Sequence, residues 1–251
     1  GGTIVYTATL TNAAQTAVTV TLSSGQTIGI AAGATSGTVS IPAPTDDPYI
    51  DAGSVSRTIT SASGGNFESL VVNPVAATTT VSDTIDVTTA TLTATPSVAE
   101  GGTITYTVSL TSPVTGSAVT VTLAGGQTIT IPVGASSGTA TATAPDNAYV
   151  GGGSVANNIA SISGGNFEQL TPNNAVVTTT VTDDADVTTV TLTATPSVVE
   201  GSNITYTATL SNVAQTAVTV TLSTGQTITI TAGATTGTVS IAAPGDDPYI
   251  D

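Results

Sequence analysis

The sequence predicts an all-β protein built from tandem immunoglobulin-like β-sandwich domains in an extended array. Three observations support this fold class. Apolar and polar residues alternate along short runs. Clusters of Gly, Pro, Asn and Ser separate the runs at short intervals. The whole pattern returns with a period of about one hundred residues, which suits a sandwich rather than a short solenoid repeat.

Several sequence motifs recur almost unchanged along the chain. TLTATPSVAEGGTITYTVSL begins at Thr91, TLTATPSVVEGSNITYTATL begins at Thr191, and SGGNFE occurs at Ser63 and Ser163. The pattern resembles a window from a longer array, so we expect sheet edges to be exposed in the incomplete copies. We expect the third copy to be disordered or to borrow strands from a neighbouring molecule. The predicted domains are repeat 1 (1–86), which lacks its first strand, repeat 2 (87–186), which is complete, and repeat 3 (187–251), which lacks its last strands.

The sequence pattern of repeat 2 predicts about seven strands and no helix. The runs ITYTVSL, AVTVTL, QTITI and TATATA have a strict period of two, with Val, Ile, Leu or Ala on one face and mostly Thr on the other. The immunoglobulin Cys pair and Trp are absent, so the prediction concerns the architecture alone. In chain order, the expected strands are 89–96, 102–111, 117–123, 127–132, 137–144, 153–162 and 174–182.

The composition excludes several classes of function. The chain has sixteen acidic residues but a single basic one, Arg57, for a net charge of −15. Nucleic acids and anionic membrane surfaces are therefore unsuitable partners. No apolar run reaches the length of a membrane span, which predicts no membrane insertion. Without His, Cys or Lys, no ordinary nucleophile–base pair can form, so we expect neither an enzyme nor a small-molecule substrate.

The acidic residues lie between the predicted strands. In an antiparallel sandwich, three of the loops and the end of the last strand share one pole, so acids in these segments should meet where one domain joins the next. The first junction would hold Asp46, Asp47, Asp51, Asp83 and Asp86. The second would hold Glu100, Asp146, Asn147, Asp183, Asp184 and Asp186. The motif PTDDPYID of the first junction returns as PGDDPYID at the end of the chain, with Asp246, Asp247 and Asp251.

These junctions need a counter-charge. Two carboxylates 4 Å apart repel by about 4 kcal/mol at an effective dielectric near 20, and Arg57 cannot serve both junctions. Ca²⁺ binds carboxylate, amide and backbone oxygens, whereas zinc would require His or Cys. The sequence therefore predicts calcium ions as the cofactor. Solvated turns are the competing interpretation, because Asp-Asp-Pro is a common turn sequence.

Three positions make the ligand sets less uniform. Repeat 2 has Asn147 and Gly151 where repeat 1 has Asp residues, so the second site carries less charge. Glu68 and Glu168 belong to loops at the opposite pole. Glu168 could meet the preceding linker, but solvation is the more common state of such residues, and the sequence leaves both interpretations open.

Several ordered motifs resemble the extender repeats of giant Gram-negative biofilm adhesins, the large adhesion protein or RTX adhesin family. They include GQTITIPVGASSGTATATAP, DDPYIDAGSVS, SGGNFE and VTDDADVTT, and the resemblance covers the whole chain. It implies tandem sandwiches, calcium-stiffened linkers, type I secretion and extracellular display on a cell surface, attached to the outer membrane. It also implies that Glu100 and Glu200 match calcium positions. The departure at Gly151 puts the contribution of that loop in doubt.

The function expected from these features is structural. We expect an extender or spacer region of a cell-surface adhesin, rigidified by Ca²⁺ at the interdomain linkers, which projects an adhesive tip for cell adhesion and biofilm formation. The partners would be calcium ions and neighbouring repeats of the same chain. The alternative is a repeat module that itself binds a glycan or a host surface protein. The nearly identical Thr-rich faces of the copies argue against such a dedicated site.

Overall fold

The computed structural model describes residues 2–245, which form twenty-two β-strands and no helix. The all-β prediction is therefore confirmed. Among these residues, no helical segment has the length and apolarity that a membrane span requires. Every strand is short, as expected from the closely spaced turn residues of the sequence.

The residue contacts divide the chain into two compact units. Unit 1 comprises Gly1–Ala94, Thr105–Thr141 and Ala156–Val177. Unit 2 comprises Thr95–Ile104, Ala142–Val155 and Thr178–Asp251. Repeat 2 contributes to both units, and the names repeat 1, 2 and 3 are kept below for the sequence ranges defined above.

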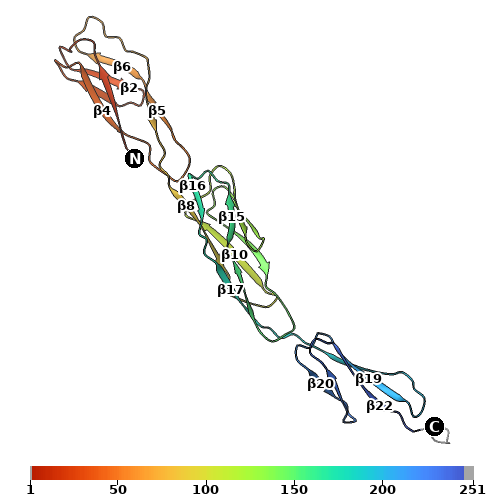
Figure 1. The fold of residues 1–251 in the computed structure, drawn as a ribbon. Helices are drawn as coiled ribbons and strands as arrows, with labels where there is room; N and C mark the ends of the chain where they lie inside the picture. Colours follow the sequence, from red (N-terminus) through yellow and green to blue (C-terminus); the bar gives the residue numbers. More distant parts are fainter. Residues whose placement is uncertain (1, 246–251) are drawn as a thin grey trace. The chain divides into compact units, whose positions relative to one another are not determined.

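Repeat 1, in unit 1, consists of three small antiparallel sheets (Figure 1). In each strand, successive side chains alternate between the core and solvent, which is why the period-two pattern of the sequence suits them. The sheets are β1 (Thr3–Thr9) with β4 (Ser36–Pro42), β3 (Thr27–Ile30) with β2 (Val18–Leu22) and β6 (Ile59–Gly64), and β5 (Gly53–Arg57) with β7 (Ala77–Val81).

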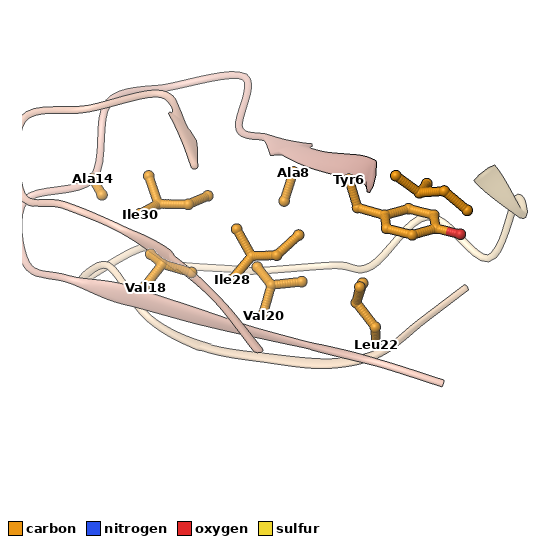
Figure 2. Packing of buried hydrophobic residues seen from close by; sticks show 9 residues of the cluster. Tyr6, Ala8, Ala14, Val18, Val20, Leu22, Ile28 and Ile30 are labelled. Atoms are coloured by element: carbon orange, nitrogen blue, oxygen red, sulfur yellow. The ribbon is translucent and has the colours of Figure 1, made fainter. Parts of the chain in front are cut away.

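The core of repeat 1 lies between the first two of these sheets. Figure 2 shows Tyr6 and Ala8 of β1 facing Val20, Leu22 and Ile28 of the β3–β2–β6 sheet. All five side chains are buried. This is sandwich packing, in which the inner faces of two sheets form a common apolar layer. The outward positions of the same strands are mostly Thr, which keeps the exposed faces polar.

Repeat 2 contributes two sheets that lie mostly in unit 1 and one that lies mostly in unit 2. In Figure 1, β8 and β16 lie side by side, and their pairing is parallel, whereas β8 and β10 are antiparallel. In unit 1, the four-stranded sheet has the order β13 (Ser137–Thr143), β10 (Thr103–Leu110), β8 (Val87–Ala94) and β16 (Gln169–Pro172), and the three-stranded sheet has the order β12 (Thr128–Ile131), β11 (Val119–Leu123) and β15 (Ile159–Ser163). In unit 2, the order is β14 (Gly153–Asn157), β17 (Val177–Thr182) and β9 (Ser97–Ala99).

Three features of repeat 2 differ from the strands expected from the sequence. The first strand breaks before Pro96, so β8 and β9 belong to different sheets. The expected strand 153–162 breaks at Asn158, beside the buried residue Asn157. The Asn157 side chain accepts hydrogen bonds from Gly125 N (2.9 Å) and Asn158 N (3.0 Å), and it donates one to Gln127 Oε1 (3.0 Å). Strand β16 was not expected, because it forms only through parallel pairing with the distant β8.

The described part of repeat 3 belongs to unit 2 and forms sheets rather than disordered chain. One sheet has the order β18 (Val190–Ala194), β19 (Asn203–Leu210) and β22 (Thr236–Ala242), and the other pairs β20 (Val218–Thr221) with β21 (Thr227–Ile230). Its core is small and centres on Ala208, Leu210, Ile228 and Ile230. By contrast, all five side chains of β18 are exposed.

Two glycines provide a matched test of this backbone. Gly164 (φ +96°) and Gly126 (φ +87°) both occupy the left-handed region, but a Cβ at Gly164 would lie 2.2 Å from Ala118 O, whereas Gly126 has nothing within 4 Å. In urea unfolding, Gly126→Ala should cost about 1–2 kcal/mol from backbone strain alone. Gly164→Ala should cost more, because the backbone must also shift. Equal losses for the two variants would contradict the packing described here.

Two candidate metal centres

The upstream cluster consists of Asp46, Asp83 and Glu168. Asp46 follows β4, Asp83 follows β7, and Glu168 precedes β16. Each contributes a carboxylate oxygen to a group whose atoms all lie within 4.8 Å of one another. Asp46 and Asp83 belong to repeat 1, where Asp83 lies in the segment 82–86 that leads into repeat 2 (the linker), and Glu168 belongs to repeat 2. All three lie in unit 1.

Hydrogen bonds from the linker hold these carboxylates in place. Thr84 Oγ1 donates to Asp46 Oδ2, and Asp86 N donates to Glu168 Oε2 at 2.5 Å. Asp51 N lies 3.2 Å from Asp83 Oδ2, to which it donates. Thr84 thus orients an acid of repeat 1 through its hydroxyl, and Asp86 orients an acid of repeat 2 through its backbone N–H.

A second contact lies beside the upstream cluster. The ring of Tyr49 lies 5.6 Å from the ring of Phe167, and the Tyr49 hydroxyl donates to Pro113 O at 2.7 Å. Backbone hydrogen bonds join the same two loops, from Glu168 N to Pro48 O (3.1 Å) and from Ile50 N to Asn166 O (3.1 Å). The loop that carries Asp46 is therefore attached to the loop that carries Glu168 by an apolar contact and a short backbone pairing.

The downstream cluster, in unit 2, consists of Glu100, Asp146 and Asp184, whose carboxylate oxygens also lie within 4.8 Å of one another. Glu100 N donates to Thr182 O (2.9 Å), and Asn147 Nδ2 donates to Glu100 Oε1 (2.9 Å). Next to Glu100, Gly101 has a positive φ of 66°. A Cβ at Gly101 would lie 3.4 Å from Asp146 Oδ2, which is an ordinary contact distance, so the positive φ rather than the spacing favours glycine here.

Glu100 is the most informative residue of the two clusters. Only 7% of its surface is exposed, and its Oε2 is buried without a hydrogen-bond partner. Burial, with the charges of Asp183, Asp146 and Asp184, raises the pKa of Glu100 despite a lowering contribution from the backbone N–H of Asn147. A buried carboxylate surrounded by others is costly unless a cation or a proton neutralises it.

Three further acids have raised pKa values. The hydrogen bond from Asp86 N lowers the pKa of Glu168, but burial and the neighbouring carboxylates outweigh it, so the net direction is upward. The Glu168 Oε1 atom is buried without a hydrogen-bond partner. Burial and adjacent carboxylates also raise the pKa values of Asp51 and Asp186. Both clusters therefore carry more negative charge than their surroundings stabilise.

Arg57 does not compensate the upstream cluster. Its Nη1 donates to Ser56 O at 2.8 Å. Arg57 pairs with Ala77, whereas Gly53 pairs with Val81 at the end of the ladder near the linker. The four residue steps from Gly53 to Arg57 correspond to about 13 Å along the strand.

The donor set fits Ca²⁺ better than other common metals. Each cluster offers three carboxylates and nearby backbone oxygens, and no His or Cys exists in the chain. The unpartnered oxygens of Glu100 and Glu168 are suited to a cation, because each already lies within a group of carboxylates. A cation within each cluster would offset the repulsion between its carboxylates and the cost of burying their charge.

The structure brings most of the sequence-predicted residues together. In unit 1, Asp51 and Asp86 accompany the upstream cluster, and Asp47 accepts a hydrogen bond from Tyr49 N (2.9 Å) within its own loop. In unit 2, Asn147, Asp183 and Asp186 accompany the downstream cluster. Glu200 is exposed, unlike its counterpart Glu100. Asp246, Asp247 and Asp251 lie outside the described residues.

The two glutamates of the SGGNFE motifs differ. Glu68 is exposed, whereas Glu168 belongs to the upstream cluster. The sequence left the role of Glu168 open, because nothing in SGGNFE itself indicates that the loop packs against the 46–51 loop of the preceding repeat. The Tyr49–Phe167 contact was not predicted at all. The recurrence of Tyr49 as Tyr149 and Tyr249 was the sequence feature that could have pointed to a packing role for this tyrosine.

Comparison with known proteins identifies the family to which these features belong. The profile of a family described as the LapA domain matches residues 1–84, 86–184 and 186–251. The chain is also similar to the solved structure of a tetra-tandem repeat in the extending region of a large adhesion protein. That similarity has 21% identity and a TM-score of 0.29, and covers 100% of this chain and 68% of the other. A TM-score this low does not establish how the repeats are arranged. No protein with a curated description matches.

The raised pKa values predict an unusual dependence of stability on pH in chelator. Each shift makes the folded chain bind more protons than the unfolded chain, between the ordinary carboxyl pKa of about 4 and the raised value. Their contribution is fully present below the ordinary pKa and is lost as pH rises through the raised values. In EDTA, the melting temperature should therefore fall as the pH rises above the ordinary carboxyl pKa values. A melting temperature that rises across this range would contradict the assignment.

The aromatic contact predicts a difference between two tyrosines. Tyr49→Phe should lower the free energy of unfolding by about 1 kcal/mol, because Pro113 O loses its donor. Tyr149→Phe is the matched control, since no hydrogen bond of the Tyr149 hydroxyl occurs in the described part of the chain. Urea titrations of both variants measure the difference, and equal stabilities would count against the contact.

Proposed function

Because the chain belongs to the LapA domain family, we propose that it is an extender segment of a cell-surface adhesin, stiffened by Ca²⁺ at its acidic clusters. One observation carries the proposal. Glu100 is buried with an unpaired oxygen, has no basic neighbour, and lies within 4.8 Å of two other carboxylates. Such a group is unfavourable in the metal-free protein, and it has the oxygen chemistry that calcium prefers.

The upstream ion would be held by Asp46, Asp83 and Glu168, and the downstream ion by Glu100, Asp146 and Asp184. Asn147 has a supporting role, because its amide donates to Glu100 Oε1 and so leaves Oε2 available. Bound Ca²⁺ would supply two positive charges, which would offset most of the negative charge of the three carboxylates in each cluster. The remaining residues orient the ligands. Asp86 N fixes one oxygen of Glu168, and Thr84 fixes one oxygen of Asp46.

Stiffening follows from where the upstream ligands originate. Asp46 lies in the loop after β4 of repeat 1, Asp83 in the segment that leads from repeat 1 into repeat 2, and Glu168 in repeat 2, so one ion would tie three segments together. The Tyr49–Phe167 contact and its backbone hydrogen bonds form a second attachment beside the first. Two attachments restrict bending more than a single flexible linker can. A stiff segment of this kind acts as a spacer and needs no catalytic group.

The same chemistry would couple folding to location. In a calcium-poor cytoplasm, repulsion between the acids favours a flexible chain, which suits export by type I secretion. In a calcium-rich exterior, metal binding would favour the folded and stiff state. The segment would then hold an adhesive tip away from the cell during attachment and biofilm formation.

Calcium should raise the stability of the chain. For a site with a dissociation constant of about 10⁻⁴ M, 10 mM Ca²⁺ corresponds to about 2.7 kcal/mol of stabilisation. Glu100→Gln should remove most of the downstream contribution. Glu68→Gln is the matched control, because Glu68 is exposed and lies outside both clusters. Thermal melts with and without Ca²⁺ measure the effect, and the absence of any stabilisation in the unaltered chain would refute the proposal.

Stiffening itself is tested by small-angle X-ray scattering of the full chain. The maximum dimension should increase, and its distribution should narrow, when millimolar Ca²⁺ replaces EDTA. Glu168→Gln should reduce this response, because it weakens the ligand that repeat 2 supplies, whereas Glu68→Gln should leave it unchanged. An identical scattering profile in both buffers would reject the mechanical role even if calcium binds.

A further inference from the structure

The first and last strands of repeat 2 run in the same direction. In unit 2, β9 pairs in parallel with β17, and Val98 lies opposite Val181 at the centre of the pair. In unit 1, β8 and β16 are likewise parallel. Each of these pairs joins the beginning of repeat 2 to its end, so the way in which they are held affects how the whole repeat opens.

Backbone hydrogen bonds close both ends of the β9–β17 pair. Thr180 N donates to Pro96 O at 3.0 Å, and Glu100 N donates to Thr182 O at 2.9 Å. The bonds of a parallel ladder are evenly spaced along the strands. The two strands are therefore held together over the whole length of β9, from the residue that precedes it to the residue that follows it.

Two threonine hydroxyls reinforce this pair. Thr179 Oγ1 donates to Thr95 O at 2.7 Å, and Thr182 Oγ1 donates to Val98 O at 3.3 Å. Thr179 has an exposure of 0%, so its hydrogen bond is shielded from water. Thr88 of β8 is equally buried, but among the described residues its hydroxyl has no hydrogen-bond partner. Of these two buried threonines, only Thr179 uses its hydroxyl to join the strands.

The direction of the two strands decides how a pulling force acts on them. Repeat 2 begins at Val87, the first residue of β8, and its last strand, β17, ends at Thr182. Tension along the chain therefore pulls the first strand toward its N-terminal end and the last strand toward its C-terminal end. In a parallel pair these directions are opposite, so the strands must slide past each other. Sliding strains all the hydrogen bonds at once, whereas separation from one end would break them one at a time.

We propose that the β9–β17 pair, with the hydroxyl bond of Thr179, is a mechanical clamp that keeps repeat 2 folded under tension. This role rests on the proposed function, because a spacer between a cell and an attached tip carries tension when the cell is pulled away. Strand β8 is paired on both edges, with β10 and β16. Among the described residues, β17 is the only partner of β9, so the hold on β9 depends on this pair.

The lifetime of repeat 2 under constant force tests the clamp. The full chain is held by its two ends in EDTA, and the unfolding of residues 87–182 is recognised by a gain of about 300 Å in length. Thr179→Val should shorten the lifetime about fivefold, because it removes a buried hydrogen bond and forced unfolding reports the unfolding rate. Thr88→Val is the matched control, and it should leave the lifetime unchanged because the Thr88 hydroxyl joins no strands.

A core variant separates mechanical strength from overall stability. Val121 is buried in β11, which belongs to a different sheet from β9 and β17. Val121→Ala should lower the urea midpoint at least as much as Thr179→Val does, because it leaves a cavity, yet it should shorten the lifetime under force less. Equal lifetimes for Thr179→Val and Thr88→Val, or lifetimes that simply follow the urea midpoints of the three variants, would overturn the proposal. Calcium binding is tested by the thermal melts and plays no part in this measurement in EDTA, so the clamp and the calcium sites fail independently.

Discussion

Uncompensated negative charge is the constraint on which this structure depends. Fifteen of the sixteen acids have no basic residue to offset them, and the two clusters concentrate these charges in particular loops. At Glu100 the constraint is strongest, because a nearly buried carboxylate lies beside Asp146 and Asp184. Apolar packing between the sheets forms the cores, whereas the acids of the two clusters lie together without a basic residue beside them. The fold and the proposed stiffness of the linkers thus rest on different physical interactions.

The two clusters contain different parts of the same kind of acidic junction. The upstream cluster has no counterpart of Glu100 among the described residues, and the downstream cluster has no counterpart of Glu168. If positions one hundred residues apart are equivalent, a junction with all its parts would combine a Glu100-type and a Glu168-type carboxylate with an Asp46-type and an Asp83-type carboxylate. Four carboxylates from both repeats and the linker come close to the six to eight oxygens that calcium takes, with backbone and water supplying the rest.

The sequence predicted what is local and left open what depends on distant pairing. Alternation in ITYTVSL and its relatives identified the strands, because exposure follows the period of the side chains. It did not predict that Pro96 would separate β8 from β9, or that Asn157 would separate β14 from β15, because the sheet that each piece joins depends on remote partners. Glu100 could be placed from topology. Glu168 and the Tyr49–Phe167 contact could not, since they depend on two loops of different repeats meeting.

The carboxyl carbon resonances of Glu100 and Glu168 test the central claim most directly. They report on the two oxygens proposed as ligands, and Glu68 serves as an internal reference. As Ca²⁺ is added to the chelator-treated full chain, the account predicts saturable shifts of both resonances, with midpoints at or below the millimolar range and no change at Glu68. If Glu100 and Glu168 stayed unshifted, or moved only in parallel with Glu68, the acids would not be calcium ligands and the account would be contradicted.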